Sequence, residues 1–120
     1  MQFNFKQKYD LKDRKKKYEE QKLKYPNRFP VICEKDPISK PNITNIKSRY
    51  LLPFDMTVNQ FMLMLRNKLK LNESESFFFL INGKYSVSGN QNLYEIYKKY
   101  KDKEDGFLYI IYSNEVLWGN

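Results

Sequence analysis

The sequence predicts an α+β domain in which two helices precede a mixed sheet. Three observations predict this class. Short apolar runs typical of strands alternate with segments of helical periodicity, the segment Asp10–Lys24 ahead of them contains neither glycine nor proline, and 41% of the 120 residues are apolar and 17% aromatic. That apolar content is sufficient for a packed core in one domain of this length.

The N-terminal part of the chain is expected to be helical. Asp10–Lys24 is rich in strong helix formers, and its apolar residues recur loosely at helical spacing before a Pro-Asn pair ends the pattern. A shorter helical turn over residues 4–8 presents Phe3 and Phe5. Residues 1–27 are therefore predicted to form a helical extension that packs on the core.

The pattern then changes to strands. We expect a strand over Phe29–Glu34, a polar link over residues 36–45 and a second strand over Arg49–Pro53. A long helix follows over Thr57–Lys70, and its first residue forms a capping-box arrangement with Gln60 three positions later.

The remaining elements complete one domain over residues 28–115. A strand over Phe77–Ile81 leads through an Asn-Gly turn to a short helix over Asn92–Tyr100 and a closing strand over Phe107–Tyr112. If the first and last strands lie side by side in mid-sheet, with the long helix across one face, this order is the β-grasp, or ubiquitin-like, arrangement. Other α+β layouts are compatible with the same order.

The last residues, 116–120, are expected to form a flexible tail that carries chemistry performed by other proteins. The chain ends Trp118-Gly119-Asn120. Because glycine has no Cβ, its backbone enters a narrow slot that excludes other residues, which suits a tail that one enzyme cleaves and another ligates. The alternative is that Gly119 is only a frayed terminal residue.

Residue counts argue against an enzyme. The chain has no histidine, so it has neither an imidazole relay for nucleophilic catalysis nor a histidine metal ligand, and its carboxylates are dispersed. Alternation places the single cysteine, Cys33, on one strand face with Phe29 and Val31, as a small core residue. We expect no metal, no cofactor and, given one cysteine and no secretory or membrane-spanning segment, a cytoplasmic protein.

The formal net charge of +8 is concentrated near the N-terminus. Residues 6–28 contain ten Lys or Arg against four acidic residues. Such a concentration of positive charge favours an anionic partner, namely an acidic peptide, a lipid surface, tubulin-like tails or nucleic acid. A solvated helix face explains the charge pattern equally well. Nucleic acid is not expected, because the aromatic residues are not interleaved with the basic segment.

Two segments are more apolar than the fold requires. Tyr50-Leu51-Leu52 is apolar on both strand faces and ends at Pro53, a residue typical of sheet edges, and the long helix leaves Met64 at the rim of its inward face. A partner peptide could add a strand at such an edge. The alternative is that the N-terminal extension covers this surface.

Three separated blocks resemble one known family. They are Lys24–Lys35, which leads into the first strand, Arg49–Phe61, which joins a strand to the long helix, and Asp105–Tyr109, with the ending Trp118-Gly119. Together they resemble, nearly end to end, the autophagy ubiquitin-like modifiers, which include GABARAP, microtubule-associated light chain three and their fungal counterpart.

The resemblance implies a modifier rather than an enzyme. A cysteine protease would remove Asn120, and activating and conjugating enzymes would join Gly119 to phosphatidylethanolamine. The protein, a monomer before lipidation, would then sit on the autophagosome membrane and recruit cargo receptors that carry an aromatic-x-x-aliphatic motif with acidic flanks. The alternative function is an unconjugated basic β-grasp module that binds acidic peptides, tubulin or nucleic acid.

The resemblance also assigns a first pocket, for the motif's aromatic side chain. At two positions where the family usually has Glu and Ile, this chain has Lys17 and Gln21, which should weaken that pocket unless Tyr18 or Leu23 compensates. Arg28, Lys47 and Arg49 would attract the motif's acids. The pocket itself would be lined by Pro30, Ile32, Arg49, Leu51 and Phe107.

A second pocket, for the motif's aliphatic residue, is implied with only conservative changes. It would be lined by Tyr50, Leu52, Pro53, Met56, Phe61 and Met64.

Overall fold

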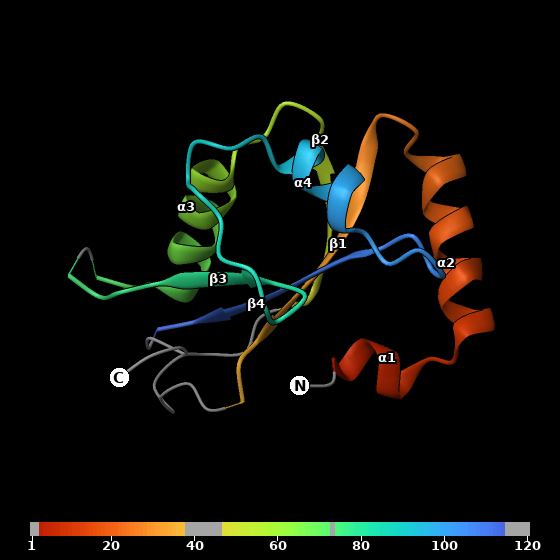
Figure 1. Cartoon of the computed structure of the whole chain (residues 1–120), viewed down its shortest axis with the longest axis horizontal. Coiled ribbons are helices and arrows are strands. Elements are labelled where there is room, and N and C mark those ends of the chain that lie inside the picture. The colour runs from red at the N-terminus through yellow and green to blue at the C-terminus, as the bar shows by residue number, and fades with distance from the viewer. Residues whose placement is uncertain (1–2, 38–46, 73, 115–120) are drawn as a thin grey trace.

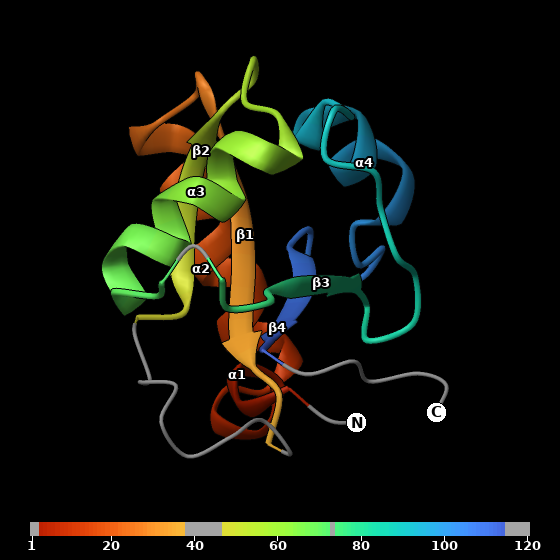
Figure 2. The ribbon, with the colours of Figure 1, turned by 90° about the vertical axis from the view of Figure 1, so that its left-hand side faces the viewer.

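A computed structural model describes residues 3–37, 47–72 and 74–114 of the chain. The elements are α1 (Asn4–Lys8), α2 (Leu11–Lys24), β1 (Arg28–Lys35), β2 (Arg49–Pro53), α3 (Val58–Leu69), β3 (Phe78–Ile81), α4 (Leu93–Tyr100) and β4 (Leu108–Ser113). Figures 1 and 2 show three layers, with the sheet between α3 on one face and α1 and α2 on the other.

The four strands lie in the order β2-β1-β4-β3. The first and last strands in sequence are central and parallel, and their register runs from Val31 opposite Leu108 to Lys35 opposite Tyr112. Strands β2 and β3 pair antiparallel on either side of them. This mixed sheet confirms the predicted β-grasp arrangement and places β2 at an edge.

The face of the sheet toward α3 holds the main core. Its strand residues include Phe29, Val31 and Cys33 of β1, and the inward stripe of α3 consists of Val58, Phe61, Leu65 and Leu69, all buried. The core position of the cysteine agrees with the sequence prediction.

The predicted capping box starts α3. The Thr57 hydroxyl oxygen accepts from the Gln60 backbone N–H at 3.2 Å, and the Thr57 N–H donates to the Gln60 side-chain oxygen at 2.8 Å. These two bonds satisfy backbone donors that have no partner within the helix.

A second core lies on the opposite face of the sheet, under α1. Phe3 and Phe5 are buried there against Ile32, Phe107 and Tyr109. The predicted helical turn over residues 4–8 is present, and its two phenylalanines anchor it to this core.

A buried carboxylate fixes the start of α1. The side chain of Glu34, on β1, accepts from the backbone N–H groups of Asn4 at 2.7 Å and Phe5 at 3.0 Å. Such charge-assisted bonds satisfy two free donors of the first helical turn. Glu34 thereby ties the short helix to the sheet.

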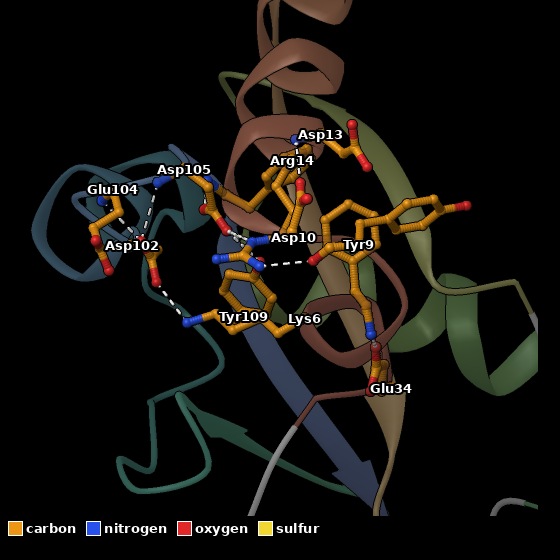
Figure 3. A network of polar contacts seen from close by, with 12 residues as sticks. Lys6, Tyr9, Asp10, Asp13, Arg14, Glu34, Asp102, Glu104, Asp105 and Tyr109 are labelled. Carbon is orange, nitrogen blue, oxygen red and sulfur yellow. Dashed lines mark hydrogen bonds and ion pairs between the residues drawn. The ribbon is translucent and has the colours of Figure 1, made fainter.

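Two ion pairs join the N-terminal helices to the loop before β4 (Figure 3). Arg14 Nε donates to Asp105 Oδ2 at 2.8 Å, and Lys6 Nζ lies 2.6 Å from Asp102 Oδ2. The Tyr109 hydroxyl also donates to Asp105, and burial together with this bond raises the pKa of that tyrosine. Asp105, whose side chain has no exposed surface, is therefore paired on several sides.

We expect the Lys6–Asp102 pair to stabilise the fold only above acidic pH. Partial burial favours a raised pKa of Asp102, but the hydrogen bond from Lys6 and bonds from the Asp105 and Glu104 N–H groups outweigh it and lower the pKa. A carboxyl with a lowered pKa in the folded state contributes stability above its unfolded pKa of about 3.9, and loses it as pH falls through the folded value.

The measurement is urea unfolding of the wild type and Lys6→Met between neutral pH and pH 3. Part of the acid-induced loss of the unfolding free energy should be absent in Lys6→Met. Equal pH dependence in both proteins would contradict the expectation. Lys8→Met, on the same helix, is the control and should behave as the wild type.

Candidate functional site

Strand β2 presents the outer edge of the sheet. It pairs with β1 on one side, and no other strand among the described residues pairs with its far side. An edge strand has backbone N–H and C=O groups that can pair with an added extended peptide. No described strand therefore occupies the edge at which the sequence predicts a dock.

A hollow of about 740 Å³ lies beside this edge; we call it the edge hollow. Its charged groups are all cationic, and none of the described residues that line it carries a carboxylate. The guanidinium of Arg28 also donates to the Leu51 carbonyl oxygen at 3.2 Å, so one cation is held against the β2 backbone. The lining residues are Gln21, Tyr25, Arg28, Lys47, Ser48, Arg49, Tyr50 and Leu51.

Helix α2 borders the edge hollow at Gln21, one of the two positions where the sequence departs from the resembled pattern. Gln21 lines the hollow, and its side-chain oxygen is buried with no hydrogen-bond partner in the described part of the chain. Lys17 places its ammonium 4.3 Å from the ring centroid of Tyr9. The α2 side of the hollow is therefore polar at Gln21, whereas Lys17 does not line the hollow.

Of the two residues expected to compensate, only one faces the protein. Leu23 is 83% exposed. Tyr18 packs edge-on against Phe107, with ring centroids 6.1 Å apart, and its ring carbons would lie 2.7 Å from a Cβ on Gly106. Tyr18 thus covers Phe107, and it does so because the glycine leaves room for its ring.

The residues expected to line the first pocket are divided between the surface and the core. Arg49 is exposed and Leu51 is partly buried, and both line the edge hollow. Pro30 is buried. Ile32 and Phe107 are completely buried in the core under α1 and do not line the edge hollow.

The residues expected to line the second pocket are divided in the same way. Tyr50, Leu52 and Phe61 are buried in the main core. Pro53, Met56 and Met64 are partly buried around them, and the neighbouring Leu63 is 59% exposed on α3. The partly buried residues are the ones that an aliphatic side chain can reach.

A smaller hollow of about 250 Å³ lies between α2 and α4, and we call it the tyrosine pocket. It shares Gln21, Arg28 and Leu51 with the edge hollow. Four of its lining residues are predicted for the first pocket or its α2 wall, namely Tyr18, Gln21, Pro30 and Leu51. Its α4 side was not predicted, although that helix has tyrosines three apart, each followed by a lysine four positions later. Its other lining residues are Tyr18, Lys22, Pro26, Phe29, Pro30, Phe54, Tyr94, Tyr97 and Lys101.

The described residues offer little for catalysis. Burial, with the nearby charge of Glu34, raises the pKa of the Cys33 thiol well above its ordinary value, so the thiol stays protonated. Among residues 3–37, 47–72 and 74–114, no group of three His, Cys, Asp or Glu side chains could hold a metal ion, and no helix has the length and apolarity to cross a bilayer. The predicted cleavage and conjugation residues, Trp118, Gly119 and Asn120, lie outside the described residues.

Comparisons with known proteins agree on one family. The model for "Autophagy protein Atg8 ubiquitin like" matches residues 13–119. Autophagy-related protein 8 of Coccidioides immitis is 38% identical over 121 residues, covering the whole of both chains, and that of Emericella nidulans is 38% identical over 100% of this chain and 99% of the relative. Human microtubule-associated protein 1 light chain 3 gamma is 35% identical over 96% of this chain and 78% of its own length.

Proposed function

Because this chain belongs to the Atg8 family of ubiquitin-like autophagy proteins, whose members are non-enzymatic modifiers, we propose that it is cleaved after Gly119 and conjugated to phosphatidylethanolamine. A cysteine protease, an activating enzyme and a conjugating enzyme perform the chemistry, and the chain is their substrate. On the autophagosome membrane it recruits cargo receptors through the β2 edge.

The cationic edge hollow beside the open side of β2 carries the receptor-binding part of this proposal. An extended peptide that pairs with β2 gains main-chain hydrogen bonds. Its alternate side chains reach the edge hollow on one side and the partly buried Pro53, Met56 and Met64 on the other. Arg28, Lys47 and Arg49 lie beside that path and attract acidic flanks. This combination matches an aromatic-x-x-aliphatic motif between acidic residues.

Mass spectrometry of the protein from starved cells tests the conjugation. We expect a form that lacks Asn120 and carries a phosphatidylethanolamine adduct on Gly119. If the full-length mass persists unchanged throughout starvation, the alternative function, an unconjugated basic module that binds acidic peptides or tubulin, is favoured instead.

We expect Gln21→Ile to tighten the binding of an acidic aromatic-x-x-aliphatic peptide by about fivefold to tenfold. The substitution replaces a buried, unpaired amide oxygen with an apolar wall for the aromatic side chain. Titration calorimetry measures the dissociation constant. A control peptide with alanine in place of the aromatic residue should gain nothing, and an unchanged constant for the aromatic peptide would show that neighbouring residues already close the wall.

A further inference from the structure

The tyrosine pocket is built from a continuous cluster of aromatic rings. Ring centroids lie 4.5 Å apart between Phe54 and Tyr94, 5.3 Å between Phe29 and Tyr94, and 5.1 Å between Phe29 and Tyr97. Tyr18 closes the α2 side. Two rings remain accessible, because Phe54 is 41% exposed and Tyr94 is only partly buried.

One ring of the cluster is fixed in place by hydrogen bonding. The Tyr97 hydroxyl donates to the Gly106 carbonyl oxygen at 2.6 Å. Burial, followed by the interaction with Tyr18, raises the pKa of Tyr97. The pocket therefore has a rigid floor on its β4 side, and a ligand meets preformed walls there.

The charged groups around the pocket are all cationic. Lys22, Arg28 and Lys101 line it, and none of the described lining residues is acidic. The ammonium of Lys101 lies 5.4 Å from the Tyr97 ring centroid, and that of Lys22 lies 5.9 Å from the Tyr18 centroid. An apolar side chain that packs against these rings is thus surrounded by cationic groups, which attract carboxylates on the same ligand.

The size and position of the pocket indicate the kind of ligand. A volume of about 250 Å³ suits one large side chain and is too small for a folded partner. The wall formed by Gln21, Arg28 and Leu51 also borders the edge hollow. One extended segment can therefore lie along β2 and place a further side chain between α2 and α4.

We propose that the tyrosine pocket is a second docking site, which takes one aromatic side chain from the acidic segment adjoining a motif bound at the β2 edge. This inference rests on the proposed receptor binding, since the motif holds the segment in place. Its effect is to select, among acidic motifs, those with an additional aromatic residue at the right distance. Two linked contacts on one segment also raise the affinity beyond that of either alone.

The test uses the full chain and synthetic acidic peptides that contain Trp-x-x-Leu. Phenylalanine is placed at successive positions on either side of the motif, and each peptide is compared with its serine counterpart by calorimetry. At one position we expect phenylalanine to bind about fivefold to tenfold more tightly than serine, because its ring leaves water for the pocket. No advantage at any position overturns the proposal.

Two pairs of variants locate the advantage in the pocket. Tyr94→Ala should bring the phenylalanine-to-serine ratio close to one, whereas Tyr85→Ala, which removes an exposed tyrosine outside the pocket, should leave the ratio unchanged. Lys101→Glu should weaken binding of the phenylalanine peptide more than Lys103→Glu does, although both change the net charge equally. Thermal melting confirms that each variant is folded.

The outcomes separate this inference from the function on which it rests. If no peptide binds the wild type, receptor binding at β2 fails and the second site fails with it. If the peptides bind but Tyr94→Ala leaves the ratio as in the wild type, only the tyrosine pocket is excluded. If the phenylalanine-to-serine affinity ratio falls in Tyr94→Ala but not in Tyr85→Ala, the tyrosine pocket binds the phenylalanine ring of the peptide.

Discussion

Replacing Gly119 by alanine is expected to abolish anchoring of the protein in membranes. The proposed conjugation needs two enzymes to reach the same carbonyl group, first for cleavage and then for ligation. A Cβ at this position obstructs a slot shaped for a bare backbone, and both steps are affected. The measurement is the fraction of protein that sediments with membranes from starved cells, together with its intact mass.

Two further chains make this result interpretable. A chain that ends at Gly119 needs no protease and should become anchored even in cells that lack that enzyme. Trp118→Phe retains an aromatic residue before the glycine and should remain a substrate. If Gly119→Ala becomes anchored as the wild type does, the proposed conjugation site is wrong.

Asp105→Ala is expected to cost the largest share of folding stability of any single substitution discussed for this protein. The carboxylate is fully buried, pairs with Arg14, and accepts from the Tyr109 hydroxyl and from the Phe107 N–H at 2.9 Å. Removing it leaves the partly buried guanidinium without its counter-ion and two donors without an acceptor. The expected loss in the free energy of unfolding is about 3–5 kcal/mol.

Urea unfolding followed by circular dichroism measures this loss, and an adjacent acidic residue provides the control. Glu104 is exposed, and Glu104→Ala should change stability by no more than about 0.5 kcal/mol. Similar unfolding midpoints for the two variants would contradict a structural role for the Asp105 network. Arg14→Met together with the double variant measures the coupling between the two partners.

The elements of the fold were predictable because each one has a local cause. Three features depend only on a few consecutive residues. They are the Thr57 capping box, the alternation through Cys33, and the turn at Asn82 and Gly83, both of which have positive φ. The observed bounds differ from the predicted ones by a residue or so, since caps such as Asn92 lie just outside the helix they start.

The links between distant elements were not predictable in the same way. Nothing near Arg14 in the sequence indicates that its partner is Asp105, and Glu34 reads as a strand-end residue although it caps α1. The sequence predicts that the first helices pack on the core, but it does not indicate that Phe3 and Phe5 pack against Ile32, Phe107 and Tyr109. The tyrosine pocket was not predictable for the same reason, because α2 and α4 are far apart in the sequence and meet only in the folded chain.

The central pairing of β1 with β4 has a consequence for how the protein is made. The two strands that hold the middle of the sheet are separated by most of the chain, so their contacts form only after both have left the ribosome. Until then, Phe29 of β1 and the aromatic residues of the first helices lack their cover. The exposed apolar surface therefore makes the newly made chain prone to association until β4 pairs with β1.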